Sequence, residues 1–237
     1  LSEPTVDQID NLTRDLVEFD FDCIIGVGGG SCMDISKALS ITLSDNLIQT
    51  AANYQGWDLV KYRGVYEIGV PTIFGTGAEA TRTCVLTNPT TGKKLGINSG
   101  FSVFDEVIID PSVSHTVPRN QYFFTAMDTF IHSFESLEGR YRNLLSDAYS
   151  AQAIEICRSI FESGDMASDA NRAQLAVASY LGGCAVAGSF VGLVHPLSAG
   201  LSVALGLHHC VANCIAMRAV ADFYPEAFSE FWGYVRK

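Results

Sequence analysis

The stretch that decides the fold is "CIIGVGGGSCMDISK", which runs from Cys23 to Lys37. Its first residues are short, apolar and rich in β-branched side chains, a composition typical of a buried parallel strand. A turn made of Gly28, Gly29, Gly30 and Ser31 follows, and the pattern after it is helical. A strand, a glycine turn and a helix in this order begin a βαβ unit, which predicts a parallel sheet covered by helices.

The rest of the chain divides into two parts with different patterns. A helical pattern covers residues 6–19, and short strands are expected at 66–75, 93–99 and 106–111. From about Pro118 the strand pattern stops, and helices are expected at 119–139, 143–163, 169–189 and within 192–217. We therefore predict an α/β domain over residues 1–114 and a helical domain over residues 115–237.

The composition restricts the classes of protein to which the chain can belong. Of its 237 residues, 48% are hydrophobic and 17% are charged, which is enough apolar material for a sizeable core. The net charge of −11 argues against nucleic acids and anionic membranes as partners, because both require a basic surface. No apolar run is long and clean enough to cross a bilayer. Seven scattered cysteines favour reduced thiols and a cytoplasmic location.

Two glycine turns are candidate ligand sites. Glycines allow a ligand to approach the backbone, and a helix N-terminus attracts anions, so the turn at Gly28–Ser31 suits a pyrophosphate. Ser31 stands where the GxGxxG pattern has its third glycine, and an ordinary tight βα turn is the alternative. A second turn, with Gly75, Thr76 and Gly77, also follows an expected strand. Ligands of open α/β sheets bind at such strand ends.

Polar residues interrupt the apolar helical half. Asp128 and His132 are four residues apart, so on a helix they share one face and can reach one ion; a buried Asp–His hydrogen bond is the alternative. His195 and His209 are fourteen residues apart, roughly 21 Å along a straight helix, so the chain must turn between them for both to bind one ion. Gly206 offers that turn. One carboxylate and three imidazoles together suit Fe(II) or Zn.

Other residues near these histidines have different interpretations. His208 adjoins His209 and should point elsewhere, toward the substrate or the residues around the metal. Cys210 and Cys214 are four residues apart and offer a competing thiolate site, although their apolar neighbours favour buried thiols. His115 is interpreted as an ordinary loop histidine.

The motifs "GGGSCMDISK", "PTIFGTGAEATR", "KKLGINS", "AMDTFIHSFES" and "HPLSAGLSVALGLHHCVAN" resemble those of the iron-containing, group III metal-dependent alcohol dehydrogenases. The likeness covers nearly the whole chain. It implies a Rossmann-like parallel sheet followed by an all-α metal-binding domain, the fold shared with dehydroquinate synthase. Within the family, "YQGWDLVK", "GTGAEATRT", "ESLEG" and "FYPE" resemble the Kdo 8-oxidases. These oxidise the C8 alcohol of 3-deoxy-α-D-manno-octulosonate (Kdo), a lipopolysaccharide sugar, ahead of amination.

The resemblance also implies roles for individual residues. The metal, Fe²⁺ or Zn²⁺, would be bound by Asp128, His132, His195 and His209. The cofactor NAD(P), with NAD favoured, would be bound by residues of both glycine turns and their neighbours, namely Gly28, Gly29, Gly30, Ser31, Asp34, Thr72, Gly75, Thr76 and Lys94, and Lys37 would continue the first motif along its helix. The metal would act as a Lewis acid on the substrate hydroxyl before hydride passes to the nicotinamide. A homodimer acting on a small alcohol or sugar acid is expected.

Some expectations concern the substrate and the departures from the family pattern. Arg82 could pair with a substrate carboxylate, with a surface ion pair as the equal alternative, and Trp57 and Tyr54 could form a stacking wall. Many relatives carry a further histidine where this chain has Ala199, so the role of that histidine cannot be transferred. The family's opening strand–helix–strand portion and its last helices are expected to be missing.

Three alternatives remain at this point. The chain could act on another alcohol, such as a small diol. It could be a lyase of the dehydroquinate synthase type, which should show more basic residues around its substrate and a different ligand set. It could also be an inactive, truncated chain that keeps a structural metal.

Overall fold

The computed structural model describes residues 3–44 and 49–236. The chain forms two compact units, which are considered separately. The N-terminal unit comprises the chain up to Ile73 together with Ala78–Val113, and the helical unit comprises Phe74–Gly77 and the chain from Ser114 onward.

The N-terminal unit contains two small sheets. Its helices are α1 (Val6–Leu16) and α2 (Gly30–Leu43), and its strands are β1 (Cys23–Gly28), β2 (Gly56–Trp57), β3 (Tyr66–Pro71), β4 (Thr83–Asn88), β5 (Lys93–Asn98) and β6 (Glu106–Val107). The first sheet has the order β1-β3-β6 and is parallel throughout, as predicted. The second has the order β2-β5-β4, and there β4 and β5 are antiparallel.

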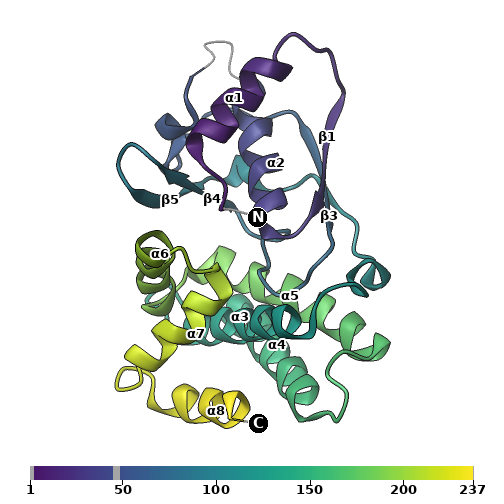
Figure 1. Cartoon of the computed structure of the whole chain (residues 1–237), viewed down its shortest axis with the longest axis vertical. Coiled ribbons are helices and arrows are strands. Elements are labelled where there is room, and N and C mark those ends of the chain that lie inside the picture. Colours follow the sequence, from purple (N-terminus) through teal and green to yellow (C-terminus); the bar gives the residue numbers. More distant parts are fainter. Residues whose placement is uncertain (1–2, 45–48, 237) are drawn as a thin grey trace. The chain divides into compact units, whose positions relative to one another are not determined.

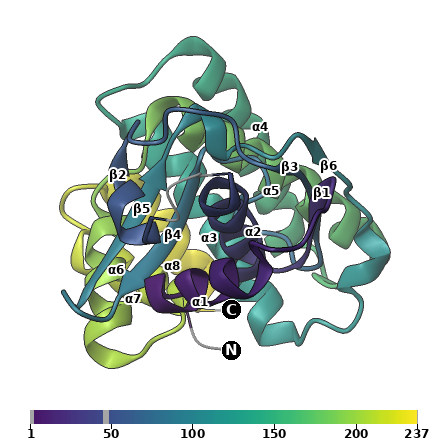
Figure 2. The same cartoon turned by 90° about the horizontal axis from the view of Figure 1, so that it is seen from above.

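This antiparallel hairpin corrects the expectation of a purely parallel sheet. The segment between Asn88 and Lys93 is too short for the crossover that parallel neighbours need, and it closes with a hydrogen bond from Gly92 N to Asn88 O. Helix α2 packs against β1 and β3 of one sheet and β4 of the other, and Figure 2 shows it between the two sheets. Its core residues therefore surround the helix, which explains why the sequence shows no clear amphipathic stripe there.

The helical unit contains α3 (Arg119–Glu138), α4 (Leu144–Glu162), α5 (Asp169–Ser189), α6 (Val194–Leu205), α7 (His209–Ala219) and α8 (Pro225–Val235). Helix α3 is central, since it packs against α4, α5 and α7 (Figure 1). The predicted helices over residues 119–217 are confirmed. Helix α8 was not predicted from the sequence; Pro225 begins it, and it buries Ala227 and Phe231 against the core of the unit.

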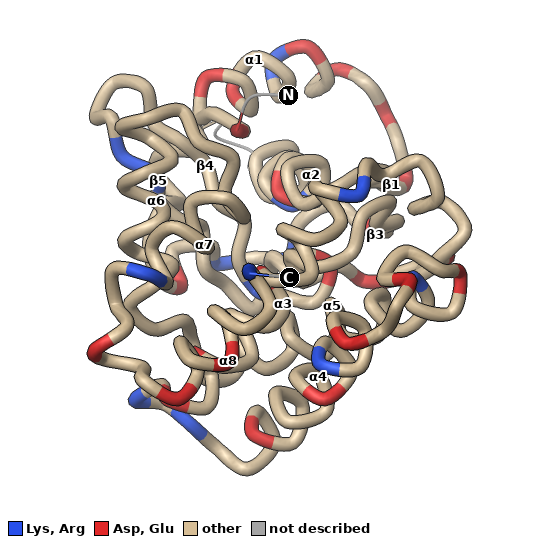
Figure 3. Tube along the Cα trace, turned by 60° about the horizontal axis from the view of Figure 1, so that its bottom comes forward, with Lys and Arg blue, Asp and Glu red and all other residues tan. Residues whose placement is uncertain are grey.

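Among the described helices, none alone has the length and hydropathy to cross a bilayer, although α5 and α6 pass that test as a pair bent by 106°. Figure 3 shows lysines and arginines scattered among acidic residues along the described trace.

Candidate functional site

Three helices of the helical unit bring a carboxylate and two imidazoles together. Asp128 lies on α3, His195 on α6 and His209 at the start of α7, and one ligand atom from each lies within 4.8 Å of the other two. Asp128 is fully buried, and His195 is 8% exposed. This arrangement matches the donor set that Zn²⁺ and Fe²⁺ accept, namely imidazole nitrogen and carboxylate oxygen.

The chain turns between the two histidines at the predicted residue. Helix α6 ends at Leu205, and Gly206 follows in the left-handed conformation with φ of 66°. Most other residues would be strained there, whereas glycine adopts this conformation readily. His208 is then the N-cap of α7, and His209 is its first residue. The break predicted from the fourteen-residue spacing is confirmed, and it allows His209 to approach His195.

His132 lies beside this group but is not part of it. Its ring stacks on the ring of His195, with centroids 4.2 Å apart and planes 13° apart. It is 7% exposed, and its Nδ1 has no hydrogen-bond partner among the described residues. A buried ring nitrogen without a partner is costly unless an ion or water satisfies it. The role of His132 as a fourth ligand stays a prediction.

Asn213 of α7 occupies the space among the three donor atoms. Its amide nitrogen lies 2.5 Å from Asp128 Oδ1 and 3.2 Å from the Nε2 atoms of both His195 and His209. An amide NH₂ carries only two hydrogens, so it cannot donate to three acceptors at once. A cation would therefore satisfy donor atoms that this neutral amide cannot satisfy alone.

The ionisation of the group reflects its buried charges. Burial alone would raise the pKa of Asp128, but the imidazoles of His132, His209 and His195 outweigh it and hold that pKa well below its usual range. Burial would likewise lower the pKa of His195, but the carboxylates of Glu135 and Asp128 raise it to about 9. Burial and the neighbouring His195 lower the pKa of His132 to about 4. The helical unit thus contains an ionised carboxylate whose partners are imidazoles.

The cysteine alternative receives no support from this geometry. The group of converging ligands found among the described residues contains no cysteine. Burial, reinforced by Asp128, raises the pKa of the Cys214 thiol to about 12, so it stays protonated. Cys210 is buried, with Sγ 3.5 Å from Asp128 Oδ2.

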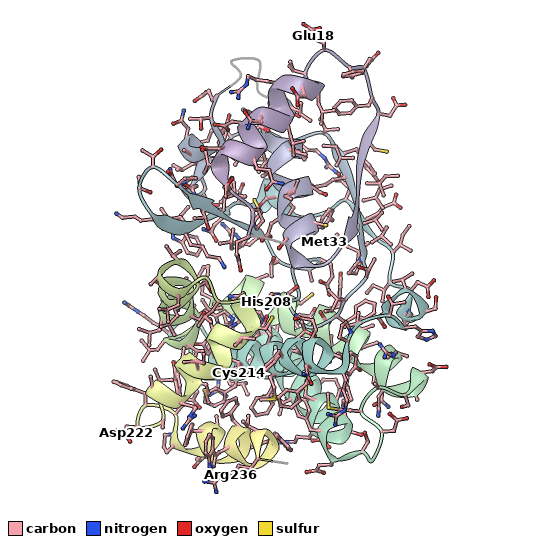
Figure 4. The ribbon with its side chains drawn as sticks, in the orientation of Figure 1. Glu18, Met33, His208, Cys214, Asp222 and Arg236 are labelled. Atoms are coloured by element: carbon pink, nitrogen blue, oxygen red, sulfur yellow. The ribbon has the colours of Figure 1, made fainter. Side chains whose placement is uncertain are left out.

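His208 is not part of the group of donor atoms and contacts α3 instead. Figure 4 labels it where α7 begins, with Cys214 further along that helix. His208 is exposed, and its Nε2 lies 3.4 Å from Gln121 Nε2.

In the N-terminal unit the first glycine turn leads directly into α2. Gly29 is the N-cap of that helix, and it has no side chain that could accept from the first backbone N–H groups. The carbonyl of Gly28 accepts a hydrogen bond from Thr72 N at 2.8 Å, which joins the turn to the end of β3. The turn therefore presents the features that suit an anion, a free helix N-terminus and a nearby strand end.

Lys37, expected to extend the pyrophosphate motif, has an internal role in this structure. It is fully buried, and its ammonium donates to the carbonyls of Ala78 at 2.6 Å, Thr81 at 2.7 Å and Thr83 at 3.2 Å. Burial raises the pKa of Asp34 to about 7 although Lys37 lies near it. Lys37 thus holds the loop before β4, and a cofactor-binding role for Asp34 stays a prediction.

The second glycine turn belongs to the helical unit. Gly75 N donates to Ser179 Oγ and Gly75 O accepts from Thr129 Oγ1, both at 2.8 Å. A Cβ atom on Gly75 would lie 2.0 Å from Thr125 O, so only glycine fits. These contacts with α3 and α5 explain why Phe74–Gly77 clusters with the helices, and the placement of Gly75 and Thr76 along a cofactor is untested.

The remaining predicted residues of the N-terminal unit have protein partners or are exposed. Lys94, expected near a ribose, pairs with Glu3 at 2.5 Å. Arg82 Nη2 lies 2.5 Å from Asp58 Oδ1, which corresponds to the surface ion pair considered as the alternative. Trp57 is 56% exposed, whereas Tyr54 is buried and its hydroxyl lies 2.8 Å from that of Tyr62.

Glu135 and Asn213 lie at the candidate site but were not predicted from the sequence as site residues. Both are fully buried, and Glu135 contacts Nδ1 of His195. A signal for Glu135 was present, because Asp128, His132 and Glu135 follow the spacing i, i+4, i+7 that places three residues on one helix face. Asn213 stands four residues after His209 and so shares its face.

Comparisons with known proteins identify the family of the chain. Residues 1–111 match the family model "Iron-containing alcohol dehydrogenase", and residues 123–231 match "Fe-containing alcohol dehydrogenase family, C-terminal". Sulfoacetaldehyde reductase of Bilophila wadsworthia is 32% identical over 89% of this chain and 54% of its own. The 1,3-propanediol dehydrogenase of Klebsiella pneumoniae is 32% identical over 88% of this chain and 55% of its own.

A solved structure shows the same fold. The crystal structure of sulfoacetaldehyde reductase from Bifidobacterium kashiwanohense, in complex with NAD⁺, superposes with a TM-score of 0.84 over 98% of this chain and 68% of its own, at 22% identity. The chain thus spans about half the length of the curated relatives it matches. The predicted fold, an α/β part with a parallel sheet followed by a helical part, is confirmed. The chain belongs to the iron-containing alcohol dehydrogenase family.

Proposed function

We propose that this chain is the metal- and nucleotide-binding portion of an oxidoreductase that interconverts a primary alcohol and its aldehyde, with NAD(P) as hydride carrier. The observation that carries the proposal is the convergence of Asp128, His195 and His209 within 4.8 Å. Membership of the iron-containing alcohol dehydrogenase family supports it and speaks against the lyase alternative. The presence of all three donor residues argues against the alternative of an inactive chain.

The residues fit a divalent cation, as three features indicate. The donor atoms are imidazole nitrogens and a carboxylate oxygen, the carboxylate is ionised, and the unpartnered Nδ1 of buried His132 lies in the ring stacked on His195. We propose that Asp128, His195, His209 and His132 bind the metal, as Fe²⁺ or Zn²⁺. When bound, the metal supplies a Lewis acid that lowers the pKa of the substrate hydroxyl. The side chains hold the donor atoms in place and keep Asp128 ionised.

The first glycine turn is the proposed pyrophosphate site. The backbone of Gly28, Gly29, Gly30 and Ser31 leads into α2, whose N-terminus has no side-chain cap and bears the positive end of the helix dipole. NAD is favoured because a structure of the same fold was solved with NAD⁺ bound. The cofactor supplies the hydride acceptor, whereas the turn supplies N–H donors for the diphosphate.

For the substrate we propose the C8 hydroxyl of Kdo, an acidic sugar. The motifs resembling the Kdo 8-oxidases support this choice. A relative named for sulfoacetaldehyde also acts on an anionic compound, whereas one named for 1,3-propanediol acts on a neutral diol. A neutral diol is therefore the second candidate. Arg82 should distinguish the two candidate substrates. The carboxylate of Kdo could compete with Asp58 for the Arg82 guanidinium, whereas a neutral diol has no carboxylate.

Metal content tests the proposed site directly. The purified protein and its His195→Ala variant are analysed by elemental mass spectrometry, with His115→Ala as the matched control because His115 is exposed and pairs with Asp169. We expect about one iron or zinc per chain in the wild type and the control, and none in His195→Ala. Equal metal content in all three proteins would rule out this site.

A substrate panel tests the second part of the proposal. The metal-loaded protein is assayed for NAD reduction with Kdo and with 1,3-propanediol, before and after the substitution Arg82→Gln. Loss of Kdo oxidation with unchanged diol oxidation is expected. An equal loss on both substrates would show that Arg82 does not recognise the carboxylate.

A further inference from the structure

Glu135 connects the candidate metal site to the start of a helix. It is fully buried on α3, one turn beyond His132, and each oxygen of its carboxylate has its own partner. Oε1 accepts a hydrogen bond from Val194 N at 2.6 Å, and Oε2 is hydrogen-bonded to Nδ1 of His195. One carboxylate therefore contacts both the backbone at the start of α6 and a predicted metal ligand on that helix.

The first of these contacts stabilises the start of α6. Val194 is the first residue of the helix, and its N-cap residue Leu193 provides no side-chain cap. Glu135 satisfies a backbone N–H that lacks an intrahelical partner and places a negative charge at the positive end of the helix dipole. The hydroxyl of Tyr224 accepts from Leu193 N at 3.1 Å, so a second side chain holds the same segment.

The second contact determines which nitrogen of His195 can bind a cation. An ionised carboxylate can only accept hydrogen bonds, so Nδ1 must carry the proton that it shares with Glu135. In the neutral ring, which is the form that binds a cation, the lone pair then belongs to Nε2, the nitrogen that lies 3.5 Å from Asp128 Oδ1 and 3.2 Å from the Asn213 amide nitrogen. The ring atom facing the cluster is thus the one left free to bind a metal.

We propose that Glu135 is a positioning residue that fixes the tautomer and ring orientation of His195 and thereby sets the metal affinity of the site. The inference rests on the proposed function, since it takes His195 as a ligand. Carboxylates that hold the second nitrogen of a ligand histidine typically account for about 10- to 100-fold in metal affinity.

The substitution Glu135→Gln isolates the contact with His195 from the contact with the helix. Glutamine has the same shape, and its carbonyl can still accept from Val194 N. Its NH₂ group then faces Nδ1 of His195 and donates to it, which forces the ring proton onto Nε2. We expect Zn²⁺ to bind roughly 10- to 100-fold more weakly, measured without substrate by competition with a chromogenic chelator.

Tyr224→Phe is the matched control. It removes the other hydrogen bond to the segment before α6, yet Tyr224 contacts Leu193 rather than His195. We expect its Zn²⁺ affinity to stay within about threefold of the wild type, since only ligand orientation should produce the larger change. If Tyr224→Phe weakens Zn²⁺ binding as much as Glu135→Gln, anchoring of the segment explains the effect and the proposal fails. If Glu135→Gln binds Zn²⁺ as tightly as the wild type, the proposal also fails.

Two further measurements complete the test. Long-range ¹H–¹⁵N NMR of the zinc-loaded wild type reads the tautomer of His195 without any variant at Glu135. A proton on Nδ1 is expected, whereas a proton on Nε2 would overturn the inference even if Glu135→Gln does not fold. Zn²⁺ binding by His195→Ala distinguishes failure of the positioning role of Glu135 from failure of the proposed metal site. Unchanged Zn²⁺ binding by this variant would contradict the metal site itself.

Discussion

Both units bury carboxylates, but they balance the negative charge in different ways. In the N-terminal unit, Asp34, Glu67 and Glu79 interact electrostatically with the ammonium of Lys37, which also donates to three backbone carbonyls. In the helical unit, Asp128 and Glu135 contact imidazoles, an amide and a backbone N–H, and the contacts described for them include no lysine or arginine. In the N-terminal unit the cation is a lysine of the chain itself, whereas in the helical unit we propose that it is a bound metal ion.

The comparison explains the polar residues in an apolar sequence. Burying a charge is costly unless a partner compensates for it. Lys37 is such a partner within the chain, so the N-terminal unit should be stable without added ions. The helical unit should gain stability when a divalent cation is supplied. The predictions below test this difference, beginning with the largest effect.

Replacing the internal cation should have the largest effect. In Lys37→Met, three carbonyls lose their donor and the nearby buried carboxylates lose a positive charge, so the free energy of unfolding should fall by about 3–5 kcal/mol. Urea unfolding followed by circular dichroism measures the change. Lys93→Met, at an exposed position of β5, should differ from the wild type by less than about 0.5 kcal/mol. An equally small effect of Lys37→Met would show that the N-terminal unit does not depend on this cation.

Supplying the external cation should stabilise only the helical unit. At a Zn²⁺ concentration 100 times the dissociation constant, the expected gain is about 2.7 kcal/mol. Hydrogen–deuterium exchange should show slower exchange in peptides of α3, α6 and α7, with no change in α2 or β3. In Asp128→Asn the effect should disappear, because the buried carboxylate ligand is gone. If Zn²⁺ slowed exchange equally in both units, stabilisation by the metal would not be specific to the helical unit.

A buried carboxylate of the N-terminal unit should make stability depend on pH. Burial raises the pKa of Glu67 to about 7 from its ordinary value of 4.5, although Lys37 opposes the shift. Folding therefore favours the protonated form, and this contribution is lost as pH rises from about 4.5 through 7. Glu67→Gln should be more stable than the wild type by roughly 1–3 kcal/mol at pH 8 and nearly equal at pH 4. Urea unfolding at both values tests this, and a difference independent of pH would refute it.

Two glycines of the α6 region should respond in opposite directions. Gly206 has a positive φ, so Gly206→Ala should destabilise the protein by about 1 kcal/mol. Gly200 lies inside α6, and a Cβ atom there would meet no atom within 4 Å, so Gly200→Ala should stabilise it by roughly 0.5–1 kcal/mol. Thermal unfolding of the metal-free protein compares them. Unchanged or increased stability of Gly206→Ala would show that the turn before His209 does not require glycine.

The sequence predicted local structure and ligand spacing better than it predicted strand pairing and side-chain contacts. The helix positions, the parallel β1–β3 pair and the break at Gly206 follow from periodicity, glycine turns and helix geometry, which are local properties. The β4–β5 hairpin was missed because two short strands do not reveal which neighbour each will pair with. Helix α8 was missed although its signals were present, since Pro225 stands at its first position and its apolar residues follow helical spacing.

The partners of individual side chains depend on contacts distant in sequence. Lys37 forms part of a motif, yet its hydrogen bonds reach residues more than forty positions away. Glu135 meets His195 across sixty residues, and Asn213 meets Asp128 across eighty-five. Spacing predicted that Asp128, His195 and His209 could converge, but it could not show which neighbours would orient them.

The central claim is that Asp128, His195 and His209 bind one divalent cation, and anomalous diffraction from crystals of the zinc-loaded protein tests it most directly. The account predicts one strong anomalous peak about 2.0–2.2 Å from a carboxylate oxygen of Asp128 and from a ring nitrogen of each histidine. A peak at Cys210 and Cys214 instead, or no peak in the helical unit, would contradict it.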